Sequence, residues 1–354
     1  MSVPNRGLVH TKVPTSWPIP GEHVTVQDTG SINPTSPPPA NGMVLKTLYA
    51  SFDPYLRGLL RNPESQSYTS AVPVGSAIPA GLVSQVLSSN HPDYSTNDLV
   101  VAMLPIREYN VWTHDDNAPR RPIKVDPENA GGDPRHFLGA LGMPGLTAFS
   151  SFYEIGKPKK GETIVVTSAA GAVGQLVGQL AKKEGLTVLG SVGSDDKLDF
   201  ILKDLGFDAG WNYKKEKSTK EVINKLTDGK GIDIFYDNVG GEQLEGGLDT
   251  LHDFGRIIAC GQISQYNLEE KDRYPIRNSI NTVVKRLLWQ GFIVSDPNMG
   301  AKYSAEHQKV VGQWIREGSF HPKIHETVGI ENAAEAFVGM LKGEHFGKAI
   351  LKFE

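Results

Sequence analysis

The chain has 354 residues, a formal net charge of −4 and a single cysteine, Cys260, so it is long enough for two domains with sizeable cores. Its near-balanced charge, with no basic stripe carrying interleaved aromatic residues, argues against a nucleic-acid partner, and no apolar run reaches the roughly 18 residues that a membrane-spanning helix needs. The amino terminus has no apolar segment of the secretory type, and one cysteine excludes an intramolecular disulfide, so we expect a cytoplasmic protein.

Residues 1 to about 138 are predicted to form a β-rich domain, because short apolar runs alternate with turns rich in Pro, Gly and Asn. The clearest predicted strands are 24–26, 43–48, 81–87 and 99–103. The proline-rich stretch 31–42 is expected to be a surface loop. A helix is predicted over 146–155.

The most informative stretch runs from residue 161 to residue 178. A β-branched run at 163–167 predicts a buried parallel strand. A turn of small residues follows, and then a predicted helix, which is the layout that binds a dinucleotide pyrophosphate at a helix N-terminus. Gly171 would let backbone approach a phosphate, and Gly174 would let the helix pack on the strand. The turn residues predicted to contact a cofactor are Ala169, Gly171, Ala172, Val173 and Gly174.

Strands and helices are predicted to alternate from there on, which indicates a doubly wound parallel sheet and an α/β fold. The predicted strands are 163–167, 187–192, 207–212, 232–236, 255–260 and 290–294. A further helix, strand, helix and strand follow residue 304. Because the sheet is already complete, this tail is expected to rejoin the first domain. The predicted domains are 1–138 completed by 317–354, and 139–316.

The end of the second predicted strand, 187–192, favours NADP over NAD. An NAD site usually places Asp or Glu there to hold the ribose hydroxyl. Here the strand runs into Gly193, and Asp195 and Asp196 are expected to cap the next helix. Lys197 and Tyr213 lie nearby in the predicted fold and suit a 2′-phosphate, although Lys197 taken alone is typical of a solvated helix.

The cysteine count also excludes a four-cysteine structural zinc site. The ten histidines are scattered, and a catalytic zinc ion needs clustered ligands. His321 and His325 are four apart, but Pro322 between them disfavours a helix. We therefore predict no metal.

Several motifs together resemble one branch of the medium-chain dehydrogenase/reductase superfamily. They are 53–58 (DPYLRG), 141–148 (LGMPGLTA), 160–175, 237–241 (DNVGG), 255–257 and 261–267 (GQISQYN). The match starts near residue 43 and extends to the end of the chain. It closely resembles the zinc-independent branch of prostaglandin reductases, plant 2-alkenal (double-bond) reductases and their bacterial and fungal relatives.

The resemblance implies a GroES-like β-rich catalytic domain, a Rossmann cofactor domain and, usually, a homodimer. It also implies NADPH-dependent reduction of the C=C bond of a small α,β-unsaturated aldehyde or ketone. The residues that match the family's 2′-phosphate contacts are Lys197 and Tyr213. The nicotinamide end is expected near Asn238, Cys260, Gly261 and a strand that carries Phe292 and Val294.

Two tyrosines, Tyr55 and Tyr266, match residues that line the substrate cleft in related enzymes. Hydride addition to an enone builds negative charge on the carbonyl oxygen, and a hydroxyl donor aimed there stabilises it. Tyr266 follows a predicted strand end, at the edge where ligands bind in open α/β sheets. A ribose hydroxyl of the cofactor is the alternative donor, in which case Tyr266 orients the substrate. Tyr55 is a substrate contact or a packing aromatic, and Cys260 is expected to be a buried small residue.

Two other functions remain open at this point. Quinone reduction by hydride transfer uses the same fold, and activity on quinones but not on enals would favour it. A cofactor-binding structural or regulatory protein without turnover is the second, and the presence of both tyrosines counts against it. An alcohol dehydrogenase is disfavoured by the missing zinc ligands.

Overall fold

The computed structural model describes residues 1–116 and 121–354 and divides them into two compact units. The first unit contains Met1–Gly139 and Ile324–Glu354, and the second contains Ala140–Lys323. The first unit thus takes both ends of the chain. The predicted fold class, a β-rich part and a doubly wound parallel sheet, is confirmed.

The second unit is built on a six-stranded sheet in which every neighbouring pair is parallel. The strand order is β10-β9-β8-β11-β12-β13. The strands are β8 (Thr163–Val166), β9 (Thr187–Val192), β10 (Ala209–Asn212), β11 (Ile232–Asp237), β12 (Leu251–Ala259) and β13 (Leu288–Gly291). Counted from β8, this is the order 3-2-1-4-5-6 of a dinucleotide-binding sheet, and the winding reverses between β8 and β11.

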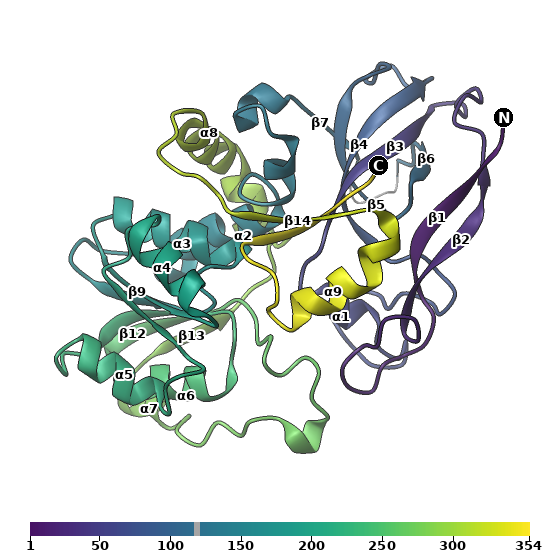
Figure 1. The fold of residues 1–354 in the computed structure, drawn as a ribbon. Helices are drawn as coiled ribbons and strands as arrows, with labels where there is room; N and C mark the ends of the chain where they lie inside the picture. The colour runs from purple at the N-terminus through teal and green to yellow at the C-terminus, as the bar shows by residue number, and fades with distance from the viewer. Residues whose placement is uncertain (117–120) are drawn as a thin grey trace. The chain divides into compact units, whose positions relative to one another are not determined.

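Helices cover both faces of this sheet, with α3 and α4 on one side and α5 and α6 on the other (Figure 1). The helices are α2 (Met143–Ser151), α3 (Ala172–Lys183), α4 (Asp195–Lys203), α5 (Thr219–Leu226), α6 (Gly241–Thr250), α7 (Asn281–Val284) and α8 (Lys302–Arg316). Because both faces are covered, the central strands carry continuous apolar runs. Ile164, Val165 and Val166 of β8 are all fully buried.

The first unit contains a seven-stranded sheet and a separate two-stranded ribbon, β1 (Val3–His10) with β2 (Val24–Ile32). The large sheet has the order β14-β15-β3-β4-β5-β7, and β6 also pairs with β3. Its strands are β3 (Gly42–Ser51), β4 (Pro79–Ser89), β5 (Leu99–Pro105), β6 (Tyr109–Thr113), β7 (Ile123–Val125), β14 (Ile324–Val328) and β15 (Lys348–Lys352). β15, at the end of the chain, lies between β14 and β3.

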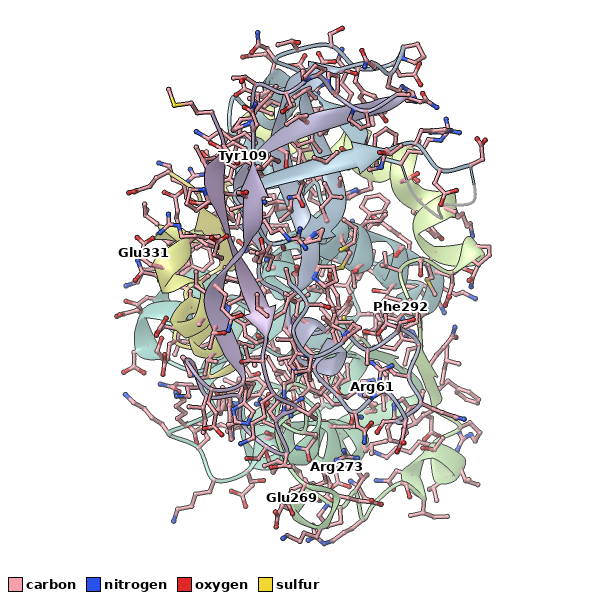
Figure 2. All side chains as sticks on the ribbon, turned by 90° about the vertical axis from the view of Figure 1, so that its right-hand side faces the viewer. Arg61, Tyr109, Glu269, Arg273, Phe292 and Glu331 are labelled. Atoms are coloured by element: carbon pink, nitrogen blue, oxygen red, sulfur yellow. The ribbon has the colours of Figure 1, made fainter. Side chains whose placement is uncertain are left out.

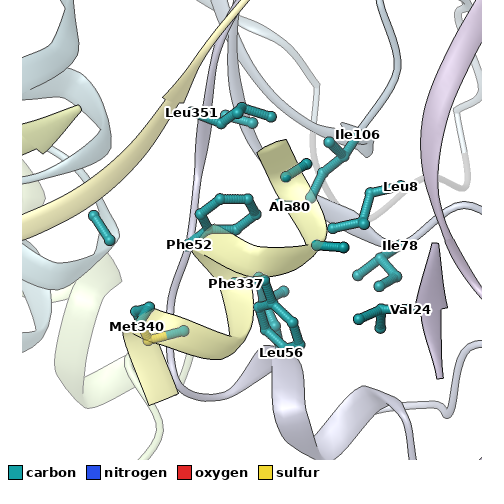
Figure 3. Close-up of a cluster of buried hydrophobic side chains, with 14 of the residues drawn as sticks. Leu8, Val24, Phe52, Leu56, Ile78, Ala80, Ile106, Phe337, Met340 and Leu351 are labelled. Atoms are coloured by element: carbon teal, nitrogen blue, oxygen red, sulfur yellow. The ribbon is translucent and has the colours of Figure 1, made fainter. Parts of the chain in front are cut away.

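The core of the first unit joins this sheet to α1 (Leu56–Leu59) and α9 (Ala333–Leu341). Figure 3 shows the apolar side chains that meet there, among them Phe52, Leu56 and Phe337. The rings of Phe52 and Phe337 have centroids 6.0 Å apart. Residues from both ends of the chain therefore share one core.

Two local predictions were wrong. The last strand of the parallel sheet is β13, Leu288–Gly291, and not 290–294, because β12, its partner in the described sheet, ends at Ala259 opposite Gly291. The N-cap of α4 is Ser194, whose hydroxyl accepts the N–H of Lys197, while Asp195 lies in the first turn. Among the helices of the described residues, none is long and apolar enough to cross a membrane.

Candidate functional site

Three loops meet at the carboxyl edge of the parallel sheet in the second unit. They follow β8 (residues 167–171), β11 (238–241) and β12 (260–267). Since β8 and β12 both pair with β11, the three loops are neighbours. Ligands of open α/β sheets bind at this edge, where the strand order reverses.

The loop after β8 makes a tight turn into α3. Ser168 has φ 52° and its carbonyl accepts the N–H of Gly171 at 2.9 Å. No side chain caps α3, whose first turn contains no acidic residue. The first N–H groups of such a helix have no partner within it and attract an anion. A Cβ on Gly174 would lie 2.4 Å from the Ser168 carbonyl oxygen, so glycine is required there.

Ala169 stands where the usual G-x-G-x-x-G pattern of dinucleotide sites has its first glycine, and the structure shows how its side chain is accommodated. The residue is fully buried. A Cβ on Gly190, in the next strand β9, would lie only 2.8 Å from the Cβ of Ala169. Gly190 therefore leaves the space that the Ala169 methyl group occupies.

The predicted 2′-phosphate residues gather at the ends of β9 and β10. The Tyr213 ring lies against Gly193, since a Cβ on Gly193 would be 3.1 Å from the Tyr213 hydroxyl. Lys197 projects from the first turn of α4 and is half-buried. Burial, and then the positive charge of Lys214, lower the pKa of Lys197. An anion bound between these two cations would offset their repulsion.

The loops after β11 and β12 are joined by hydrogen bonds. The Asn238 side-chain amide donates to the Thr167 carbonyl at 2.7 Å, and the Asn238 N–H donates to the Thr167 hydroxyl at 2.8 Å. The N–H groups of Cys260 and Gly261 both donate to the Asp237 carbonyl, at 2.9 and 3.0 Å. These contacts bring the ends of β8, β11 and β12 together.

The Cys260 thiol faces the protein interior. Burial raises its pKa to about 12, and the Tyr236 hydroxyl is its hydrogen-bond partner. Tyr236 is fully buried and shares a 2.7 Å hydrogen bond with Ser151. A thiol with this pKa is protonated at neutral pH and is a poor nucleophile. Only the backbone of Cys260 is therefore suited to contact a cofactor.

Tyr266 lies over the loop after β12. Its hydroxyl accepts the N–H of Gln262 at 3.1 Å. A Cβ on Gly261 would be 2.9 Å from the same hydroxyl. The ring is 37% exposed. The structure thus brings Tyr266 to the same sheet edge as Asn238 and Gly261.

Phe292, which is labelled in Figure 2, and Val294 follow β13 on the segment that leaves the sheet, and neither lies within a strand. Both are half-buried. The Val294 carbonyl accepts the N–H of Gly300 at 2.8 Å, which folds this segment back on itself. Their position after a strand end still places them at the carboxyl edge of the sheet.

Tyr55 belongs to the first unit, where it precedes α1 and packs on the apolar core. Its hydroxyl donates to the Met103 sulfur at 3.8 Å. The turn that carries it is held by buried charges. Lys348 lies 3.2 Å from the Asp53 carboxylate and donates to the Phe52 carbonyl at 2.6 Å.

On the other side of Tyr55, the buried Arg57 side chain donates to the carbonyls of Pro14 and Ser16, at 3.2 and 2.8 Å. The pKa of Arg57 is lowered by burial. Two buried cations therefore fix this turn, Lys348 at one end and Arg57 at the other.

Four residues at the sheet edge were missed by the sequence reasoning: Thr167, Ser168, Gly193 and Lys214. The hydroxyl at the end of β8 and the left-handed Ser168 are both part of the string TSAAGAVG, so a signal was present. Lys214 directly follows Tyr213 and carried no signal beyond its charge. Its effect on Lys197 depends on the packing of α4 beside β10.

A metal centre receives no support from side-chain geometry. In the parts of the chain that the structure describes, 1–116 and 121–354, no three His, Cys, Asp or Glu side chains are placed to hold an ion.

Comparison with known families and proteins agrees with the geometry. Residues 172–309 match the family described as zinc-binding dehydrogenase, and residues 23–119 match the N-terminal domain of oxidoreductase. An NADP-dependent oxidoreductase of Cochliobolus heterostrophus is 44% identical over 98% of this chain and 97% of its own length.

A 2-alkenal reductase (NADP(+)-dependent) of Nicotiana tabacum is 37% identical over 89% of this chain and 88% of its own. Among solved structures, CurA of Vibrio vulnificus in complex with NADPH has a TM-score of 0.87 and 32% identity, and the alignment covers 99% of both chains.

Proposed function

The chain belongs to the medium-chain dehydrogenase/reductase superfamily, and on that premise we propose that it is an NADPH-dependent reductase of the C=C bond of α,β-unsaturated aldehydes and ketones. The observation that carries this proposal is the Tyr266 hydroxyl, which is held beside Gly261 at the carboxyl edge of the parallel sheet. A relative named 2-alkenal reductase supports the substrate class.

The residues of the second unit fit NADPH. The uncapped start of α3, with Ala172 and Val173 in its first turn, would bind the pyrophosphate. Lys197 would bind the 2′-phosphate beside Tyr213, with Lys214 adding positive charge. Asn238, the backbone of Cys260 and Gly261, and the segment with Phe292 would surround the nicotinamide end. No acid follows β9 directly to compete with the phosphate.

Bound NADPH would supply a hydride to the β-carbon of the substrate. The carbonyl oxygen would then gain negative charge, and the Tyr266 hydroxyl would donate a hydrogen bond to it. A proton from water would complete the reduction at the α-carbon. The N–H of Gln262 donates to the Tyr266 oxygen. A hydroxyl that accepts a hydrogen bond is polarised toward donating its own proton. Tyr55 is proposed as a further substrate contact.

The deciding experiment follows NADPH oxidation against enals, cyclic enones, phenylbutenones and quinones, and identifies each product. The proposal requires saturated aldehydes or ketones as products, with the carbonyl intact. Turnover of quinones alone would make the protein a quinone reductase. Tight NADPH binding without any turnover would favour a structural or regulatory role.

We also propose that the domains are 1–138 with 317–354 for the substrate, and 139–316 for the cofactor, and that the protein is a homodimer. An apolar surface supports the dimer: Phe254, Ile280, Val283, Val284 and Leu288 are all exposed. They lie around β13, an edge strand whose only partner in the described sheet is β12. Open edge strands and apolar patches of this kind are usually covered.

Light scattering after size exclusion tests the dimer. We expect twice the chain mass for the wild-type protein and a monomer for Val283→Glu, which places a charge on the most exposed of these side chains. A wild-type monomer would refute the dimer and leave the proposed activity untouched.

A further inference from the structure

The buried carboxylate of Asp237 has an unusual set of partners. It ends β11 and is fully buried, yet no cation pairs with it in the described residues. Oδ1 accepts the N–H groups of Val239 and Gly240, at 3.1 and 2.8 Å. Oδ2 makes no hydrogen bond among the described residues. A buried polar atom without a hydrogen-bond partner destabilises the folded state, so the presence of this carboxylate needs an explanation.

The backbone carbonyl of the same residue holds a second loop. It accepts the N–H groups of Cys260 and Gly261. One residue thus fixes the turn after β11 through its side chain and the turn after β12 through its main chain. Both turns face the carboxyl edge of the sheet, where the proposed function places the nicotinamide end.

We propose that Asp237 is a positioning residue, whose ionised carboxylate holds the turn 238–241 in register with the turn 260–261 for NADPH binding. This inference rests on the proposed function, because the turns face a cofactor only if the protein binds one. A carboxylate accepts two N–H groups more strongly than a neutral acid does. Protonation would therefore loosen the turn 238–241 while leaving the main-chain bonds of Asp237 in place.

The surroundings of Asp237 cause its carboxyl group to ionise close to neutral pH. Burial raises the pKa of Asp237 to about 6, against the lowering effect of the Gly240 and Val239 N–H groups. Among the titratable groups of the described residues, the Cys260 thiol interacts with the charge of Asp237. Burial raises the pKa of that thiol to about 12, so it stays neutral. The Thr167 hydroxyl is close enough to lower the Asp237 pKa, although it donates to the Tyr236 carbonyl.

The test measures the Kd of NADPH by cofactor fluorescence between about pH 5 and pH 8, for wild type and Asp237→Asn. The amide oxygen of Asn can accept the same two N–H groups but cannot titrate. We expect Kd values within about threefold at pH 7.5, and at pH 5 about tenfold more loss of affinity in the wild type than in the variant. Because the 2′-phosphate itself titrates near pH 6, NADH is measured as a second probe and should show the same difference.

Asp233→Asn is the matched control. Asp233 lies on the same strand, and its Oδ2 accepts the Thr163 N–H at 2.8 Å, but it lies near the opposite end of β11. Its pH profile should follow that of the wild type. Identical profiles for wild type and Asp237→Asn would overturn the inference, whereas a wild-type protein that binds no NADPH at any pH would overturn the proposed function instead.

Asp237→Ala removes the acceptor itself. We expect it to weaken NADPH binding about tenfold or more at every pH. If it folds and binds like the wild type, the carboxylate does not position the turn and the inference fails. If it does not fold, Asp237→Asn still decides.

Discussion

At the carboxyl edge of the parallel sheet, backbone hydrogen bonds and close contacts at glycine residues hold the loops in place. In the first unit, by contrast, buried charged side chains hold the turn that carries Tyr55. Gly174 and Gly190 allow close approach in the second unit. In the first unit, Lys348 and Arg57 hold the two ends of one turn. The first arrangement leaves N–H groups available for an anion, and the second fixes an aromatic side chain. We therefore expect substitutions at the sheet edge to weaken NADPH binding, and substitutions around the turn that carries Tyr55 to lower the free energy of unfolding.

The largest effect is expected from Lys348→Met, which leaves the Asp53 carboxylate buried without its partner. Breaking a buried pair costs about 3–5 kcal/mol of unfolding free energy. Adding Asp53→Asn should restore part of it, because both charges are then gone. Urea unfolding measures the change in unfolding free energy. Lys352→Met is the control, because Lys352 is a more exposed neighbour on β15. Equal losses for both lysine variants would contradict the role of the buried pair.

Gly174→Ala should damage the other region. Its Cβ would lie 2.4 Å from the Ser168 carbonyl oxygen and 2.8 Å from the Ala169 Cα. Overpacking of this kind costs about 1–3 kcal/mol and forces the turn to shift. We expect NADPH affinity to fall at least tenfold in a fluorescence titration. Gly291→Ala, whose Cβ would meet no atom within 4 Å, should bind normally.

Lys197→Ala tests the phosphate contact alone. Losing a charge-assisted contact costs about 1.5–3 kcal/mol, so NADPH binding should weaken roughly tenfold or more. NADH binding should barely change. Calorimetric titration with each cofactor shows the difference, and an equal loss for both would rule out a 2′-phosphate role.

Tyr266→Phe should lower kcat and kcat/KM together for an enal substrate, because the donor acts on charge that develops in the transition state. Removing such a donor typically costs about 2.7–4 kcal/mol, and we expect less here because a ribose hydroxyl can compensate. Tyr55→Phe should mainly raise KM. If Tyr266→Phe raises only KM, Tyr266 binds the substrate and the cofactor provides the donor.

The smallest effect is expected from metal removal. Dialysis against a strong chelator should leave NADPH turnover unchanged, since the sequence offers no clustered ligands. Activity lost on chelation and regained with zinc would show that the zinc-free assignment is wrong.

The two regions also differ in how far the sequence could predict them. Strands β8 and β9 and the turn before α3 follow from local patterns: a β-branched run, small residues and a helix. The end of β13 could not be predicted in this way, because it depends on where β12 ends. The buried charges around Tyr55 are even harder to predict from the sequence. Lys348 meets Asp53 from the far end of the chain, and no local pattern indicates that pairing.

The position of β15 has a consequence for synthesis. This strand lies between β14 and β3, so the large sheet of the first unit cannot be completed until β15 leaves the ribosome. The second unit ends at Lys323, before β14 and β15 begin. Its own ends are joined where His307 and Gln308 bind the carbonyls of Ala140 and Leu141, at 2.8 and 2.7 Å. Domains fold as units during synthesis. We therefore expect the second unit to fold first. Its folding brings its two ends together and so shortens the loop that the pairing of β3 with β15 must close.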